Sequence, residues 1–134
     1  MKNLFVLVGR VLFSLIFVVA GVNKLMTFSA TASMMASMGI PYSEFMLVIA
    51  IIFELGGGLL ILLGWYTSFG AFLLFLFMIP VTLVFHSFWD YQGTEMVNNM
   101  HHLLKNLSMI GATFYFMVFG GGKISIDGLF RGKS

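Results

Sequence analysis

The chain has 134 residues, of which 60% are hydrophobic and only 9% are charged. Seven basic and five acidic side chains cannot supply the polar surface of a water-soluble domain of this length, and a net charge of +2 without a basic tract does not indicate nucleic-acid binding. The absence of cysteine excludes a disulfide framework, thiolate redox chemistry and cysteine-ligated iron–sulfur clusters formed by this chain alone.

Four long apolar stretches predict helices that cross a membrane. A nearly uncharged apolar stretch of about 18 or more residues is long enough to span the hydrocarbon core of a bilayer. The stretches are residues 4–22, 45–63, 69–88 and 103–119. We therefore predict an all-α fold, a polytopic integral membrane four-helix bundle that forms a single domain over residues 1–134.

The segments around these spans have recognisable start and stop signals. Lys2 precedes the first apolar run as in a secretory signal, but Arg10 interrupts the run and three spans follow, so we expect a retained helix. Residues 27–38 are predicted to form a short amphipathic helix at the membrane interface, which Gly39 ends. The glycine run 120–122 is expected to stop the last span.

Four spans place both chain termini on the same side of the membrane. The basic residues that flank the spans on that side are Lys2, Lys123, Arg131 and Lys133. The opposite side has two, Lys24 and Lys105, together with three acidic residues. The excess of basic residues assigns the termini to the cytoplasm. In a bacterium, the chain is then an inner-membrane protein whose two longer loops face the periplasm.

Two charged residues lie well inside the apolar spans, Arg10 in the first and Glu54 in the second. An ionised side chain at such a depth costs about 2.5–3.5 kcal/mol, so it has to face a partner, the bundle interior or a water-filled cavity. At ~1.5 Å per residue, Arg10 lies about 9 Å and Glu54 about 13 Å from the cytoplasmic edge. We therefore predict an Arg10–Glu54 pair. The alternative for Arg10 is a side chain that snorkels to the cytoplasmic interface.

Further polar residues gather near the opposite edge of the predicted bundle. They are Asn23, Lys24, His86, Asp90, His101, His102, Lys105 and Asn106. Arg10 and Lys24 are separated by roughly four turns at 3.6 residues per turn, so they share one helix face. We therefore predict a polar seam from the Arg10–Glu54 site to this outer rim. Histidines and lysines at span ends also have a purely structural explanation, as anchors at the headgroup level.

The residue types restrict the chemistry that the seam can support. His86 with His101 or His102 could ligate haem axially, but the spacing matches no haem motif, so haem is disfavoured. One intramembrane glutamate excludes a di-iron carboxylate site, and the eleven methionines are expected to pack, with no metal site predicted. A quinone head fits, because its carbonyl oxygens accept hydrogen bonds from lysine, histidine or arginine. A proton relay through Glu54 and a histidine fits equally well.

Six sequence elements occur together in a characteristic order. They are GRVLFSLIFVVAGVNKL, MGIP, FELGGGLLILLGWYTS, FHSFWD, LLKNLSMIGA and GGGKISID. From Gly9 to Asp127 the chain thereby resembles the DoxX family of small bacterial membrane proteins. The last element has GGG where members of that family often have GPG. The resemblance implies a four-helix transmembrane bundle in the bacterial inner membrane.

The resemblance also implies a set of motif residues and a link to redox biology. The family's motif residues fall on Arg10, Lys24, Glu54, Gly57, His86, Lys105 and Asn106. One member of the family is a subunit of thiosulfate:quinone oxidoreductase, and others resemble partners in membrane complexes that handle oxidative stress. Related eukaryotic proteins resemble assembly factors or cargo receptors. The resemblance therefore constrains the fold more closely than the activity.

The sequence leaves three functions open, and it does not decide whether the chain is itself an enzyme. The leading hypothesis is a quinone-linked redox subunit or a binder of a small amphipathic ligand, with membrane lipid, a redox protein or a second copy of the chain as partner. Its candidate ligand-binding residues are Arg10, Lys24, Glu54, His86, Lys105 and Asn106. The alternative is a non-catalytic scaffold or chaperone. A proton-coupled transporter is less favoured, because four short spans show no internal repeat.

Overall fold

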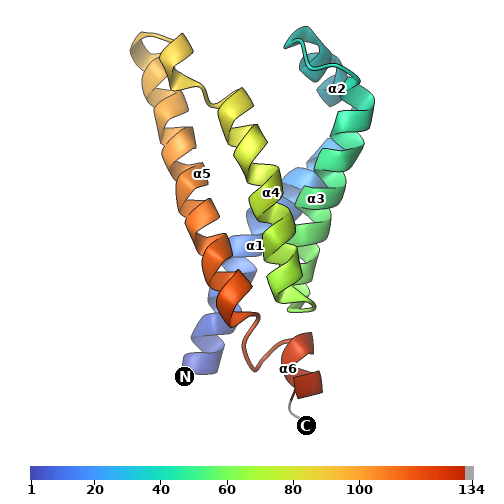
Figure 1. Ribbon diagram of the computed structural model, residues 1–134, viewed down its shortest axis with the longest axis vertical. Helices are drawn as coiled ribbons and strands as arrows, with labels where there is room; N and C mark the ends of the chain where they lie inside the picture. Colours follow the sequence, from blue (N-terminus) through green and yellow to red (C-terminus); the bar gives the residue numbers. More distant parts are fainter. Residues whose placement is uncertain (132–134) are drawn as a thin grey trace.

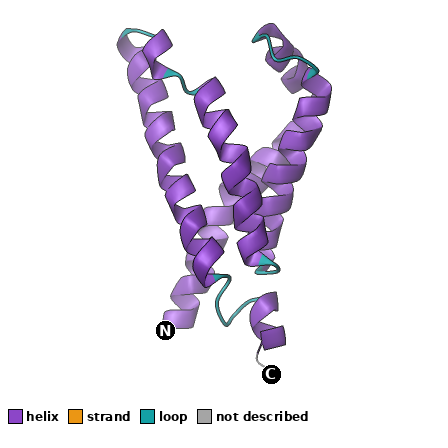
Figure 2. Cartoon of the chain, in the orientation of Figure 1, coloured by secondary structure: helices purple, strands orange, loops and turns teal. Residues whose placement is uncertain are grey.

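The computed structural model describes residues 1–131, which fold into helices joined by short connections (Figure 1). In chain order the elements are α1 (Lys2–Met26), α2 (Phe28–Ser37), α3 (Ser43–Leu63), α4 (Thr67–Phe85), the 3-10 helix η1 (Phe88–Asp90), α5 (Gly93–Phe119) and α6 (Ile126–Arg131). This range contains no strand, so the predicted all-α fold is confirmed (Figure 2). Lys133, one of the residues used to predict the topology, lies outside the described residues.

Each predicted span coincides with a long helix. Three helices of the described chain are long and apolar enough to cross a membrane: α1, α3, and α4 together with its continuation to Asp90. The fourth, α5, has 27 residues and so a length of about 40 Å, but its N-terminal part is polar. Its membrane crossing therefore stays a prediction. The short helix predicted over residues 27–38 is present as α2, and Gly39 follows it with a positive φ of 80°. Its position at the membrane interface stays a prediction.

The four long helices pack in chain order, α1 against α3, α3 against α4, and α4 against α5. The N-terminus and α6, the last described helix, lie at the same end of the molecule, which we call the closed end (Figure 1). There α5 also reaches α1, since the ring centroids of Phe13 and Phe116 are 5.0 Å apart. Toward the other end, which we call the open end, α4 and α5 diverge from α1, α2 and α3 (Figure 1). The predicted four-helix bundle is therefore splayed at one end.

Glycines set the closest contacts between the helices. A Cβ atom on Gly57 would lie 2.9 Å from the carbonyl oxygen of Gly70, so α3 and α4 approach each other through bare backbone. Gly21 has the same role between α1 and α3, because its Cβ would lie 2.7 Å from the Cβ of Leu55. These contacts fix the position of α3 along both of its neighbours.

Two apolar clusters form the core. The larger cluster joins all four long helices and consists of Phe17, Ile61, Ala71, Leu74, Phe77, Met78 and Phe116. The smaller cluster holds α2 on α3 and consists of Ala32, Met35, Leu47 and Ile51. Phe85, the last residue of α4, packs against the smaller cluster and so reaches across the open end.

The glycine contact predicts opposite effects for two neighbouring substitutions in α3. Gly57→Ala places a methyl group 2.9 Å from the Gly70 carbonyl oxygen, and overpacking of this kind costs about 1–3 kcal/mol. A Cβ on Gly56 meets no atom within 4 Å, so Gly56→Ala gains up to about 1 kcal/mol from the lower chain entropy of alanine. Thermal unfolding in one detergent should give a lower Tm for Gly57→Ala only. Equal Tm values for the two variants would contradict the close α3–α4 contact.

Candidate functional site

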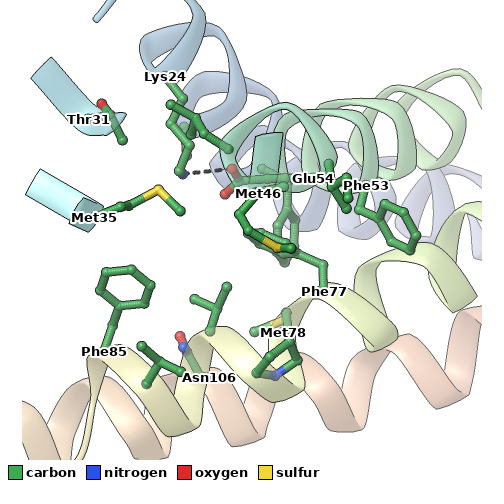
Figure 3. Close-up of a pocket in the computed structure, with 18 of the residues that line it drawn as sticks. Lys24, Thr31, Met35, Met46, Phe53, Glu54, Phe77, Met78, Phe85 and Asn106 are labelled. Atoms are coloured by element: carbon green, nitrogen blue, oxygen red, sulfur yellow. Dashed lines mark hydrogen bonds and ion pairs between the residues drawn. The ribbon is translucent and has the colours of Figure 1, made fainter. Parts of the chain in front are cut away.

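A cavity of about 650 Å³ lies at the open end of the bundle, and residues of α1 to α5 line it. Most of the lining is apolar, and it includes the methionines Met34, Met35, Met46, Met78 and Met109. Figure 3 shows Met35 and Met46 beside Lys24 and Glu54, with Phe85 and Asn106 on the opposite wall. Both the volume and the apolar lining are typical of small-molecule sites.

One ion pair lies in the wall of this cavity. The Nζ atom of Lys24, near the end of α1, donates a hydrogen bond of 2.7 Å to Oε2 of Glu54 in the middle of α3 (Figure 3). The Glu54 side chain is 7% exposed and the Lys24 side chain 29%. Among the side chains of residues 1–130 no other salt bridge is formed. The pair therefore compensates the one carboxylate that is buried among the apolar side chains.

The predicted Arg10–Glu54 pair is wrong because α1 and α3 are shifted along each other. Arg10 lies against Gly64, which follows the last residue of α3. The depth estimate placed the cytoplasmic ends of the first two spans at one level, whereas α1 extends about two turns beyond the end of α3. Lys24 is thereby brought level with Glu54.

Arg10 takes part in a different contact, at the closed end. It is 3% exposed, and its Nη1 atom donates a hydrogen bond of 2.6 Å to the carbonyl oxygen of Gly121. The segment that follows α5 covers the guanidinium, and the alternative of a side chain that snorkels to the cytoplasmic interface stays a prediction. Gly120, with a positive φ of 68°, ends α5 and turns the chain toward Arg10. The GGG run thus supplies the arginine's partner in addition to the helix stop.

The same C-terminal segment caps α4. The Asp127 carboxylate accepts hydrogen bonds from the backbone N–H of Tyr66 at 2.9 Å and of Thr67 at 3.0 Å, and from the Thr67 hydroxyl at 3.1 Å. Its own N–H donates to the carbonyl oxygen of Gly64 at 2.8 Å. A carboxylate at this position satisfies unpaired N–H groups of the first turn and interacts favourably with the helix dipole. Arg10 and Asp127 therefore hold the closed end together.

The polar groups form two separate regions, so the predicted continuous seam is wrong. Arg10 and Lys24 do share one face of α1, but buried Phe17 lies between them on that face. In α3, buried Ile61 lies between Glu54 and the helix end. Both apolar residues belong to the larger core cluster, which extends through all four long helices. An apolar layer thus separates the Arg10 region from the cavity.

The other candidate ligand-binding residues lie around the cavity, whereas its lining does not include four members of the predicted rim, Asn23, Asp90, His101 and His102. Asn106 is 5% exposed, and its Nδ2 atom donates a hydrogen bond of 3.0 Å to the hydroxyl of Thr82. His86 and Lys105 belong to the same cavity lining. The structure thus brings five of the six predicted residues to one cavity, namely Lys24, Glu54, His86, Lys105 and Asn106. Their binding of a ligand stays a prediction.

Sequence reasoning missed three contributors to these regions. Thr82, the partner of Asn106, gives no signal because a threonine inside an apolar span is ordinary. The carbonyl oxygen of Gly121 gives none either, since every residue has one. Asp127 does have a signal, its place in the GGGKISID element next to the glycine run.

The histidines of the open end do not have the arrangement of haem ligands. The rings of His86 and His102 are stacked, with centroids 5.1 Å apart and an interplanar angle of 19°. Axial ligation needs a nitrogen of each ring directed at an iron between the two rings. Among the described residues, no group of three or more histidine, aspartate or glutamate side chains could hold a metal ion.

The ion pair predicts an asymmetric response to removal of its two partners. Lys24→Met leaves a carboxylate that is almost fully buried without a cation, whereas Glu54→Gln leaves an ammonium that is partly exposed. Breaking a buried pair costs about 3–5 kcal/mol, and replacing both partners by apolar groups is often neutral. We expect the largest loss of Tm for Lys24→Met, a smaller loss for Glu54→Gln, and recovery in Lys24→Met/Glu54→Leu. The exposed Lys2 supplies the control: equal Tm values for Lys24→Met and Lys2→Met would refute the pairing.

The cap on α4 predicts a local effect of Asp127→Ala. Loss of a capping side chain costs about 0.5–2 kcal/mol, and the first-turn amides of Tyr66 and Thr67 lose their acceptors. Hydrogen exchange followed by mass spectrometry should show faster exchange at the start of α4 in this variant. Asp90→Ala, at an exposed position of η1, is the control. Unchanged exchange in Asp127→Ala would contradict the cap.

Comparisons with known proteins relate the chain to a family of membrane proteins. The sequence profile of the DoxX family matches residues 5–87. The inner membrane protein YphA of Escherichia coli K12 is 33% identical over 126 residues, which cover 94% of this chain and 90% of that protein. The inner membrane protein YqjF of the same organism is 35% identical over 133 residues, which cover 99% of this chain and 97% of that protein. No solved structure matches the chain. Having three helices long and apolar enough to cross a membrane, the chain is an integral membrane protein and belongs to the DoxX family.

Proposed function

We propose that this protein binds a small amphipathic molecule in the cavity at its open end. The observation that carries the proposal is the Lys24–Glu54 ion pair, whose charged atoms lie 2.7 Å apart in the wall of a mostly apolar cavity of about 650 Å³. A few polar groups that converge on an apolar pocket are the usual means of orienting a ligand. The pair and Asn106 would orient a polar head, and the apolar lining would hold the rest of the molecule.

We place the protein in the inner membrane, with both termini in the cytoplasm. Its two relatives are named inner membrane proteins, and the bias of basic residues toward the ends of the chain supports this orientation. The open end and its cavity then lie in the periplasmic half of the bilayer. A ligand could enter there from the lipid or from the periplasm.

A quinone is one ligand that fits this description. Its carbonyl oxygens would accept hydrogen bonds from Lys24 or Asn106, while Phe53 and Phe77 would pack against its apolar part. A quinone-linked role would further require a redox partner protein, to which this chain would present the quinone. The chain supplies no cysteine for electron transfer of its own.

A scaffold role is the second candidate, because one motif residue already has a structural task. Arg10 contacts the Gly121 carbonyl oxygen at the closed end, away from the cavity. The Lys24–Glu54 pair could likewise serve packing alone. Proton-coupled transport has less support, since the apolar layer around Phe17 interrupts a polar path along α1.

The binding proposal predicts that filling the cavity abolishes a ligand-induced stabilisation. Decylubiquinone is the first probe, added to purified protein in nanodiscs, and bound small molecules are identified by extraction and mass spectrometry. We expect a raised Tm for the wild type and for Leu107→Trp, whose position is 51% exposed and outside the cavity. The Ala50→Trp variant, in which the indole fills the cavity, should show no rise in Tm when decylubiquinone is added.

A second comparison separates binding from scaffolding. If the Glu54→Gln variant folds but its Tm no longer rises when the ligand is added, the result supports binding. If the variant fails to fold, the result supports the scaffold role. The binding proposal fails if extracts of native protein contain no bound amphiphile and neither the quinone nor any lipid-like probe raises the Tm.

A further inference from the structure

We infer that the ligand has an anionic head, a carboxylate or a phosphate on an alkyl chain, and that basic side chains at the rim of the cavity bind it. These side chains, His86, His102 and Lys105, are called the rim cluster below. The inference rests on the proposed function and narrows the class of ligand. It concerns the wall formed by α4 and α5, opposite the Lys24–Glu54 pair.

The rim cluster is compact. The ring of His86, just after α4, is stacked on the ring of His102 in α5, with centroids 5.1 Å apart. The Nζ atom of Lys105 lies 3.4 Å from Nδ1 of His102, because residues three positions apart face the same side of a helix. His86 and Lys105 both line the cavity. The ring stacking and the Lys105–His102 contact therefore bring the three side chains together, with the exposed His102 just outside the cavity lining.

No acidic side chain neutralises this cluster within residues 1–131. The one carboxylate in the cavity lining, that of Glu54, is already paired with Lys24. Asp90 and Glu95 are the acidic residues of the neighbouring η1 and α5, but they are exposed and form no salt bridge. The polar neighbours of His86 besides the cluster are the side chain of Asn99 and the backbone of Phe85, and neither is charged. The cavity therefore has an ion pair on one wall and, on the other, the positive charge of Lys105, which has no acidic partner among the described residues.

The cluster also leaves hydrogen-bonding capacity unused. The Nδ1 atom of His86 is buried and has no hydrogen-bond partner in the described part of the chain. Buried polar atoms of this kind are nearly always paired in folded proteins, so an unpaired one calls for an explanation. A carboxylate or phosphate head offers several acceptor oxygens at once, and its charge strengthens each bond. A neutral carbonyl oxygen offers acceptor positions without the charge.

The apolar lining next to the cluster suits the chain of such a molecule. Phe85 precedes His86, and Met109 lies one turn beyond Lys105 on the same helix. Both line the cavity, which continues toward Phe77 in the larger core cluster. A head at the rim thereby places the alkyl chain along the wall formed by α4 and α5. A single-chain amphiphile with an anionic head matches both the charge and the shape of the site.

The test compares probes that differ only in the charge of the head. Purified full-length protein in nanodiscs of phosphatidylcholine is titrated with oleate, hexadecyl phosphate and methyl oleate, and binding is followed by Tm shift and native mass spectrometry. We expect the two anionic probes to bind at least about tenfold more tightly than the methyl ester, the difference that one charge-assisted hydrogen bond supplies. Inorganic phosphate alone should not compete.

Two variants tie the preference to the rim cluster. His102→Gln/Lys105→Gln should reduce the preference for the anionic probes to less than about threefold, a loss of most of the charge-assisted interaction. The charge-preserving Lys105→Arg should retain the preference, which controls for folding. Lys123→Gln, at the closed end, is the matched control for loss of one basic charge.

The outcomes separate this inference from the proposed function. Equal binding of oleate and methyl oleate overturns the anionic head and leaves amphiphile binding intact. Competition by inorganic phosphate indicates a site for free anions and overturns the role of the alkyl chain. If none of these three probes binds, the inference fails, and the quinone titration and the extraction of native protein decide the proposed function separately.

Discussion

The position of the Lys24–Glu54 pair depends on how α1 lies against α3. A carboxylate in the middle of an apolar helix is costly unless a cation is close, and Lys24 provides that cation at 2.7 Å. The pair can form only in a register that brings the end of α1 level with the centre of α3. Gly21 and Gly58 permit the two backbones to approach closely in this register. The arrangement of α1 and α3 in the wall of the cavity therefore depends on the Lys24–Glu54 ion pair and on the close packing at Gly21 and Gly58.

The two ends of the bundle have different physical organisation. At the closed end, Arg10 and Asp127 bind backbone groups of distant segments and so join the C-terminal segment to α1 and α4. At the open end, α4 and α5 diverge from the remaining helices. The polar groups there surround a cavity, and in its lining only Lys24 and Glu54 form an ion pair. The apolar cluster around Phe17 separates the two regions. The motif residue Arg10 consequently stabilises the closed end, whereas the motif residues at the open end line a candidate binding site.

The helices could be predicted from the sequence because the bilayer fixes the length of an apolar span, and all four expected spans coincide with long helices. The position of one helix along another could not be predicted from the sequence. The start of α1 extends about two turns beyond the end of α3, so counting from Leu4 placed Arg10 too close to Glu54. His86, Lys105 and Asn106 could be predicted as a group because their positions along their spans place them at the same depth in the bilayer. Backbone partners such as the Gly121 carbonyl oxygen have no side-chain identity that a sequence could show.

The central claim is that the space between the Lys24–Glu54 pair and Asn106 is a ligand site of the folded protein. A high-resolution electron cryomicroscopy map of the protein, extracted from its native membrane with minimal delipidation, tests this most directly. We predict elongated non-protein density in the cavity, with its head next to Lys105 and its chain beside Phe77. A map in which α4 and α5 close against α2 and α3, with no space between the pair and Asn106, would contradict the account.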